Sequence, residues 1–177
     1  MVQGPDDPEL PDADPESVAR TILLRKLTAA PATRAQLAAL LARKGVPDDV
    51  AARVLDRYEE VGLVDDAVYA QLWVRSRQAG RGLSRRALRH ELHAKGVSDE
   101  VVAAALEEVD GEDERAAAEA LVRRKLSSLR GVDAAARTRR LMGMLARKGY
   151  SSGMAAAVVR EVLRDDEVEA MLAGSGE

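Results

Sequence analysis

The chain of 177 residues has no cysteine and no phenylalanine, and only one tryptophan, three tyrosines and two histidines. Without cysteine, a disulfide framework and thiolate chemistry are excluded. With so few aromatic side chains, a platform that stacks nucleobases is not expected. No glycine-rich phosphate loop, catalytic triad or paired-carboxylate pocket can be assembled from the sequence, so we do not expect an enzyme.

Long apolar runs are also missing. None approaches the ~18 residues that span a bilayer, and the acidic, proline-rich N-terminal segment lacks the basic and apolar regions of a secretory signal. We therefore expect a cytoplasmic protein without a membrane partner. His90 and His93 are three residues apart, not four, and no third histidine exists, so neither a metal site nor a cofactor is expected.

Charge is divided unevenly along the chain. Residues 1–16 carry six acids and no base, and residues 165–177 carry five acids and no base. The body between them holds all 27 basic residues and the other 19 acids, a net charge of +8. A basic body favours an anionic partner. We hypothesise that the acidic tails pair with this body and weaken non-specific DNA binding.

A threefold repeat runs through the basic body. A Lys-Gly pair followed by a bulky residue occurs at 44–46, 95–97 and 148–150, with spacings of 51 and 53 residues. Leucines stand eight and four residues before each glycine, namely Leu37, Leu41, Leu88, Leu92, Leu141 and Leu145. One helical unit is thus used three times, and such repeats build extended surfaces rather than catalytic pockets.

Cap and turn residues predict three helices in each unit. Asp14 followed by a proline starts the first helix, and Thr33 with Gln36 has the spacing of a capping box. The glycine of each Lys-Gly pair is suited to end a helix because it can adopt positive φ. The pairs Asp48-Asp49 and Asp65-Asp66 fit helix capping better than a magnesium site.

The fold class predicted is all-α, with three tandem three-helix (helix-turn-helix-like) repeats that form an elongated, curved array. The repeats cover 16–64, 65–110 and 111–168, and disordered acidic tails cover 1–15 and 169–177. In the fourth helix, about 66–79, Tyr69, Leu72 and Trp73 are expected to be buried; Tyr69 and Trp73 could alternatively form a partner-binding hot spot.

Two segments of the middle repeat resemble the RecX family. Residues 62–70 (GLVDDAVYA), with 73–77 (WVRSR), are similar to its most recognisable block, and residues 83–97 (LSRRALRHELHAKGV) are similar to the block that follows. The resemblance covers roughly 17–166 and leaves out the acidic tails. The sequence departs from the family at 30–33 (APAT), where family members usually carry arginines, so no contact from that turn is expected.

The resemblance implies a fold of three tandem three-helix repeats and a regulator of the bacterial recombinase RecA. Family members bind the RecA filament on single-stranded DNA, suppress its ATP hydrolysis and strand exchange, and can bind DNA themselves. The resemblance therefore implies a role in recombination, DNA repair and the SOS response. Two other readings stay open: a duplex DNA-binding protein with helix-turn-helix-like units, and a helical protein-interaction scaffold. A monomer is the expected state.

The candidate residues for binding the filament or DNA are the arginines and lysines of the second and third repeats. Guanidinium groups bind phosphates and carboxylates in bidentate fashion, and helix starts rich in arginine also occur in recognition helices. A solvated helix face is the alternative for each of them. The candidates are Arg75, Arg77, Arg81, Arg85, Arg86, Arg89, Lys95, Arg123, Arg124, Lys125, Arg137, Arg139, Arg140 and Lys148.

Overall fold

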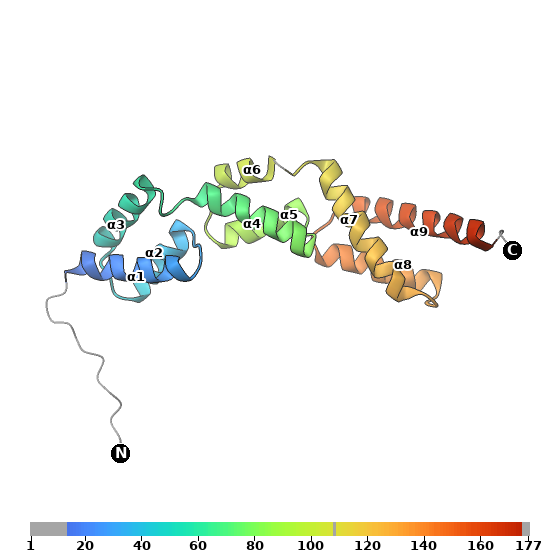
Figure 1. The fold of residues 1–177 in the computed structure, drawn as a ribbon, viewed down its shortest axis with the longest axis horizontal. Coiled ribbons are helices and arrows are strands. Elements are labelled where there is room, and N and C mark those ends of the chain that lie inside the picture. The colour runs from blue at the N-terminus through green and yellow to red at the C-terminus, as the bar shows by residue number, and fades with distance from the viewer. Residues whose placement is uncertain (1–13, 108, 175–177) are drawn as a thin grey trace, which may run out of the picture. The chain divides into compact units, whose positions relative to one another are not determined.

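A computed structural model describes residues 14–107 and 109–174, and in these residues the chain forms nine α-helices, one 3-10 turn and no strand (Figure 1). This confirms the all-α prediction. Of the tail predicted to be disordered over 1–15, residues 1–13 lie outside the described residues, whereas Asp14 and Pro15 are the N-cap and first residue of α1. Within those residues, none of the helices combines the length and apolar character that crossing a membrane requires. The elements are α1 (Pro15–Ala29), α2 (Arg34–Arg43), α3 (Asp48–Glu60), α4 (Asp66–Arg81), α5 (Arg85–Ala94), α6 (Asp99–Glu107), α7 (Gly111–Leu126), η1 (Ser127–Leu129), α8 (Ala134–Arg147) and α9 (Ser152–Gly174).

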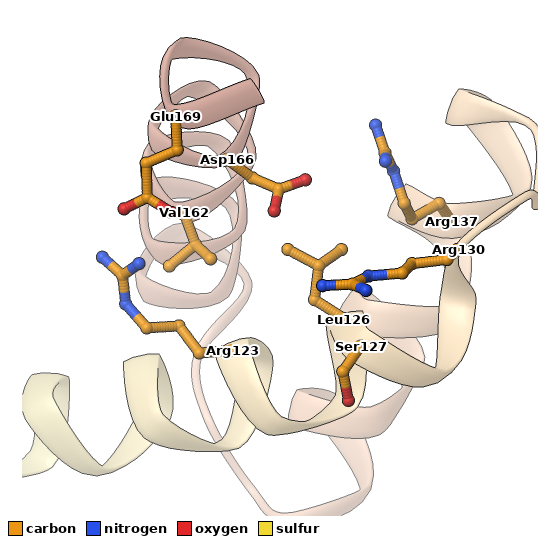
Figure 2. Close-up of a pocket in the computed structure, with 8 residues that line it drawn as sticks. All are labelled: Arg123, Leu126, Ser127, Arg130, Arg137, Val162, Asp166 and Glu169. Carbon is orange, nitrogen blue, oxygen red and sulfur yellow. The ribbon is translucent and has the colours of Figure 1, made fainter. Parts of the chain in front are cut away.

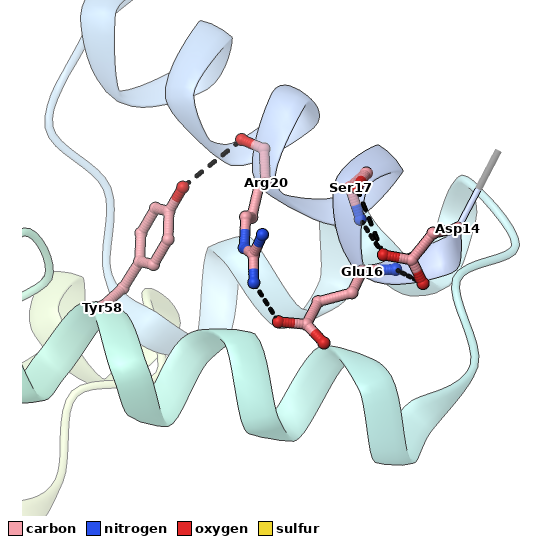
Figure 3. A network of polar contacts seen from close by, with 5 residues as sticks. All are labelled: Asp14, Glu16, Ser17, Arg20 and Tyr58. Atoms are coloured by element: carbon pink, nitrogen blue, oxygen red, sulfur yellow. Dashed lines mark hydrogen bonds and ion pairs between the residues drawn. The ribbon is translucent and has the colours of Figure 1, made fainter.

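The start of α1 is fixed by polar contacts (Figure 3). The carboxylate of Asp14 accepts the backbone N–H groups of Glu16 at 3.4 Å and Ser17 at 3.3 Å. Arg20 forms an ion pair with Glu16, and the hydroxyl of Tyr58 in α3 donates to the carbonyl of Arg20 at 3.4 Å. The predicted N-cap is therefore present, and its helix is tied to α3 by a hydrogen bond as well as by apolar packing.

The core of each repeat is built on the recurring leucines. The six leucines that stand eight and four residues before the repeat glycines all have an exposed fraction of 0%. Ten and thirteen residues after each glycine the apolar residues are buried as well, namely Leu55, Tyr58, Leu106, Val109, Val159 and Val162. Apolar positions that share one helix face thus bury themselves in all three repeats, as the repeat pattern predicts.

The Lys-Gly turns have the same backbone in all three repeats. Gly45, Gly96 and Gly149 have φ values of +76°, +77° and +88°, which confirms them as the residues that end α2, α5 and α8. In the first and third turns the N–H after the glycine bonds back across the helix end: Val46 donates to the carbonyl of Leu41 at 3.1 Å, and the corresponding third-repeat bond is 3.2 Å.

The expected burial on α4 is wrong for Leu72, which is 54% exposed, while Tyr69 and Trp73 are only half-buried. The buried residues of this helix are Ala70 and Val74, with exposed fractions of 0% and 2%. The buried face of α4 is therefore formed by Ala70 and Val74, each one residue after the large side chains, Tyr69 and Trp73, that were expected to form it. Small residues at the buried positions let neighbouring helices approach closely.

The helix α9 is longer than the sequence predicts. It runs to residue 174, so the disordered tail expected from residue 169 is corrected for 169–174. Residues 167–173 (EVEAMLA) include several of the strongest helix formers and no proline or glycine, so nothing ends the helix before Gly174. This extension is exposed: Val168 and Leu172 have exposed fractions of 50% and 72%.

The described chain divides into two compact units. One contains residues up to Tyr69 together with Lys95–Val97, and the other contains Ala70–Ala94 and the residues from Ser98 onward. The second Lys-Gly turn belongs to the first unit because it packs on the start of α2. There the hydroxyl of Thr33 donates to the carbonyl of Lys95 at 2.6 Å, and a Cβ on Gly96 would lie 2.3 Å from the Cβ of Ala35.

The third Lys-Gly turn repeats this contact inside the second unit, on the start of α5. The backbone N–H of Ser84 donates to the carbonyl of Lys148 at 3.0 Å. A Cβ on Gly149 would lie 2.5 Å from the Oγ of Ser84 and 2.8 Å from the Cβ of Ala87. We call the Lys95–Val97 and Lys148–Tyr150 segments docking turns. Each places a lysine carbonyl at the first turn of a helix, where backbone donors are unsatisfied.

An acid from the following repeat completes each docking contact. The backbone N–H of Arg34, the first residue of α2, donates to Oδ1 of Asp66 at 2.9 Å. The backbone N–H of Arg85, the first residue of α5, donates to Oε1 of Glu114 at 3.0 Å. Both acids lie in the first turn of the next repeat's first helix, so the two contacts are built on one plan.

Candidate nucleic-acid interface

Arg86 and Arg89 form the exposed basic face of α5. Both side chains are exposed, and neither forms an ion pair with any described residue. The helix N-terminus is occupied by the docking contact, since Ser84 caps it and Arg85 uses its backbone N–H for Glu114. The two guanidinium groups are thus held on an ordered helix and remain available to an anionic partner.

Arg77 belongs to a side-chain cluster that holds α4 against α5. Its guanidinium carbon lies 4.0 Å from the centroid of the Trp73 ring, and its Nε lies 3.6 Å from Oε2 of Glu91. The indole N–H of Trp73 donates to the same carboxylate oxygen at 2.8 Å. This cation–π and hydrogen-bonded arrangement gives Arg77 a structural task, whereas Arg75 on the same helix is exposed.

Arg81, Arg124 and Lys148 are brought together from three separate elements. The ammonium group of Lys148 donates to the carbonyl of Arg81 at the end of α4. Burial lowers the pKa of Lys148, and the positive charges of Arg124 on α7 and of Arg81 lower that pKa further. Converging like charges disfavour one another, so this cluster at the second docking turn is suited to an anion that would offset their repulsion.

A second basic surface is the groove between α7 and α8. Lys125, Arg139, Arg140 and Arg147 line it, the cavity has a volume of about 500 Å³, and no acidic residue contributes to its walls. Its floor is apolar or small, with Gly143 in the middle of α8 and leucine, alanine and methionine side chains around it. A groove that is lined by several cations and no acid is typical of a surface that binds a phosphate backbone.

Three further candidates lie in different surroundings. Arg123 is paired with Asp165 of α9 at 2.9 Å. Arg137 is half-buried, and its Nε is buried without a hydrogen-bond partner among the described residues. Lys95 is half-buried and contributes its carbonyl to the first docking turn. Each of these three residues is therefore paired or half-buried within the chain.

Residues outside the predicted set also belong to the candidate groove and to the docking contacts. Arg147 lines the α7–α8 groove, and its position directly before a Lys-Gly pair, shared with Arg43, was the available signal. Thr33 and Ser84 were identified only as helix caps. They are the two fully buried polar side chains of the described part of the chain, and this burial marks the docking contacts.

Geometry and charge together define an all-α protein of tandem three-helix repeats whose second and third repeats carry basic surfaces. Family models match the three repeats in order: the first three-helix domain of RecX at residues 19–57, the second at 65–106 and the third at 112–159. The chain therefore belongs to the RecX family of regulatory proteins.

Individual relatives agree with this assignment. The chain is 53% identical over 169 residues to the regulatory protein RecX of Thermobifida fusca, covering 94% of this chain and 91% of that protein. It is 51% identical over 156 residues to the regulatory protein RecX of Streptomyces coelicolor, covering 88% and 83%. The crystal structure of RecX from Lactobacillus salivarius has the same fold, with a TM-score of 0.76 at 18% identity, covering 85% of this chain and 98% of that one.

Proposed function

We propose that this protein binds the RecA filament on single-stranded DNA, inhibits RecA ATP hydrolysis and strand exchange, and has no catalytic activity of its own. The observation that carries the proposal is the match of all three repeats, in order, to the RecX domains. Its cellular role would then be to limit recombination and DNA repair by RecA in the cytoplasm.

The basic surfaces support a contact with the DNA of such a filament. The α7–α8 groove offers four cations and no acid, and the exposed face of α5 adds two arginines. Arginine binds phosphate oxygens in bidentate fashion, and contacts by several weak surfaces on one long partner add up to tight binding. We assign the groove and α5 as the primary candidates, because Arg77 and Arg123 already have partners within the chain.

The test is RecA ATP hydrolysis on single-stranded DNA, titrated with the purified protein. Hydrolysis should fall at protein amounts well below the amount of RecA, because a filament regulator acts on a polymer rather than on each subunit. If hydrolysis stays unchanged even at an excess of the protein, the proposed function is wrong. Tight binding that needs no RecA and prefers one duplex sequence would favour a stand-alone DNA-binding protein, and salt-insensitive binding to proteins alone would favour a scaffold.

Matched variants separate the basic surfaces from general charge effects. R139Q/R140Q removes two cations from the groove, and R86Q/R89Q removes two from α5. The control R25Q/R43Q removes two exposed arginines of the first repeat, outside both surfaces. Inhibition should weaken with each of the first two variants and not with the control. Equal loss with all three would show that net charge, and not these surfaces, governs inhibition.

A further inference from the structure

Another arginine-lined cavity lies where α7, η1, α8 and the end of α9 meet (Figure 2). Three arginines line it, Arg123 from α7, Arg130 from the segment after η1 and Arg137 from α8. Asp166 and Glu169 of α9 line it as well, and Figure 2 shows Arg130 and Arg137 on the side opposite α9. Its volume is about 180 Å³, enough for a phosphate group with bound water.

The arginines of this cavity are incompletely paired within the chain. Arg123 is paired with Asp165, but neither Arg130 nor Arg137 forms an ion pair with a described residue. The Nε of Arg137 is buried and has no hydrogen-bond partner among the described residues. Buried donors nearly always have a partner in folded proteins, so the Nε–H of Arg137 in this cavity is an unsatisfied hydrogen-bond donor. A group with several acceptor oxygens would satisfy it.

The repeat places Arg137 at a docking position. Thr33, Ser84 and Arg137 each stand twelve residues before the glycine of their own Lys-Gly turn. In the first two repeats this position receives the lysine carbonyl of the next repeat's turn. In the third repeat it carries a guanidinium that lines the cavity. An acceptor oxygen from outside the chain would there replace the carbonyl that the earlier repeats obtain from inside it.

The acidic side of the cavity belongs to a weakly held part of α9. Val162 is the last residue of this helix with a buried side chain, at 1% exposed, and the helix continues to residue 174. Asp166 and Glu169 are exposed, and the large apolar residues in the last part of the helix, Val168, Met171 and Leu172, are at least half exposed. A helix end with so little buried surface opens at low cost in free energy.

We propose that the cavity binds a backbone phosphate of single-stranded nucleic acid, and that the acidic end of α9 competes with this phosphate for the three arginines. The acidic end of α9 thus weakens the binding of phosphate to the cavity. Only a polyanion that also contacts the α7–α8 groove or the basic face of α5 binds tightly enough to displace it. The proposal rests on the nucleic-acid contact of the proposed function. The earlier hypothesis was that acidic tails screen the whole basic body. The present proposal assigns this effect to two carboxylates, those of Asp166 and Glu169, and to one cavity.

The experiment measures binding of a fluorescent single-stranded oligodeoxythymidylate to the full chain, without RecA, over a range of salt concentrations. The variant D166N/E169Q removes the competing charges. It should bind about twofold to fivefold tighter at low salt, because two exposed carboxylates beside the cavity no longer repel the phosphate, an effect similar in size to that of an exposed charge pair. Its log–log salt slope should steepen by about 0.7, as expected for one further phosphate contact on a single strand. The control E100Q/E107Q removes two exposed acids from α6, outside the cavity, and should keep the wild-type slope.

A second variant tests the arginine side. R130Q changes an exposed residue outside any helix, so folding should be preserved, and it should weaken binding and abolish the gain from D166N/E169Q. Equal slopes for wild type and D166N/E169Q would overturn the proposal, as would absence of oligonucleotide binding by both. Inhibition of RecA ATP hydrolysis by the same proteins is read separately, so the proposed function can survive a failure of this inference.

Discussion

Replacing the glycine of each Lys-Gly turn by alanine should distinguish the two docking turns from the first Lys-Gly turn, at Gly45, by the loss of stability that each substitution causes. Gly45, Gly96 and Gly149 share nearly the same positive φ, so alanine costs about 1–2 kcal/mol at each for the left-handed backbone alone. At Gly45 a Cβ would have no heavy atom within 4 Å. We therefore expect Gly45→Ala to lower the free energy of unfolding by that amount and no more.

The docking turns should lose more. At Gly96 the added Cβ would lie 2.3 Å from the Cβ of Ala35, and the two must separate by about 1.1 Å to reach an ordinary contact of 3.4 Å. The same movement stretches the 2.6 Å hydrogen bond between Thr33 and Lys95. At Gly149 the added Cβ would lie 2.5 Å from the Oγ of Ser84 and 2.8 Å from the Cβ of Ala87, which belongs to α5. Overpacking of this kind adds about 1–3 kcal/mol, so both variants should lose roughly 2–5 kcal/mol in total.

Urea unfolding followed by far-ultraviolet circular dichroism measures these differences as shifts of the midpoint. The variant Gly45→Ala serves as the matched control, because it has the same substitution, the same turn and the same φ class without a docking contact. Equal shifts for all three variants would refute the idea that the second and third turns are docked. A larger loss at Gly45 than at Gly96 would also contradict it.

Three further expectations follow from single contacts. Thr33→Val keeps the shape of a buried side chain but leaves the carbonyl of Lys95 unsatisfied, so the urea midpoint should fall by an amount equivalent to about 1–3 kcal/mol; an unchanged midpoint would argue against the hydrogen bond. Burial and, to a smaller extent, the charge of Glu114 raise the pKa of Tyr150 to about 12. The stabilisation of the folded state by the neutral tyrosine is therefore complete below the unfolded pKa near 10 and is lost as pH rises toward 12. The free energy of unfolding of the wild type should therefore fall by up to about 3 kcal/mol more than that of Tyr150→Phe over that range, and parallel pH profiles would contradict this. Glu91→Ala removes the acceptor of the Trp73 indole, so emission of this single tryptophan should change and acrylamide quenching should increase; identical spectra would place the indole elsewhere.

The helices and their cores were predictable because each depends on residues close in sequence. The leucines at fixed distances before each glycine are all buried, and the caps at Asp14, Thr33 and Asp65 are formed by their own side chains. These features need only helical periodicity and local hydrogen bonding. The burial predicted for α4 was wrong because apolar residues lie on more than one face of this helix. Contacts with the neighbouring helices, which the sequence pattern does not contain, determine that Val74 is buried and Leu72 is exposed.

The candidate site was predictable in composition and not in arrangement. Charge density indicated that basic side chains concentrate in the second and third repeats, but nothing in the sequence shows that Arg81, Arg124 and Lys148 meet, since they lie on three elements. Nor does it show that Arg77 stacks on Trp73 and is thereby engaged. Long side chains reach several neighbours, so their pairing depends on tertiary distances that a one-dimensional pattern does not contain.

The docking position of the third repeat differs from those of the first two repeats. The helix α8 begins four residues earlier, relative to its glycine, than α2 and α5, so the docking position falls inside the helix at Arg137. Its backbone N–H already donates to the carbonyl of Asp133 at 2.9 Å. Thr33 offers a hydroxyl at this position and Ser84 a free N–H, but Arg137 offers neither. The described residues of the three repeats therefore form two docking contacts, and at the third position our proposal assigns the guanidinium to a phosphate.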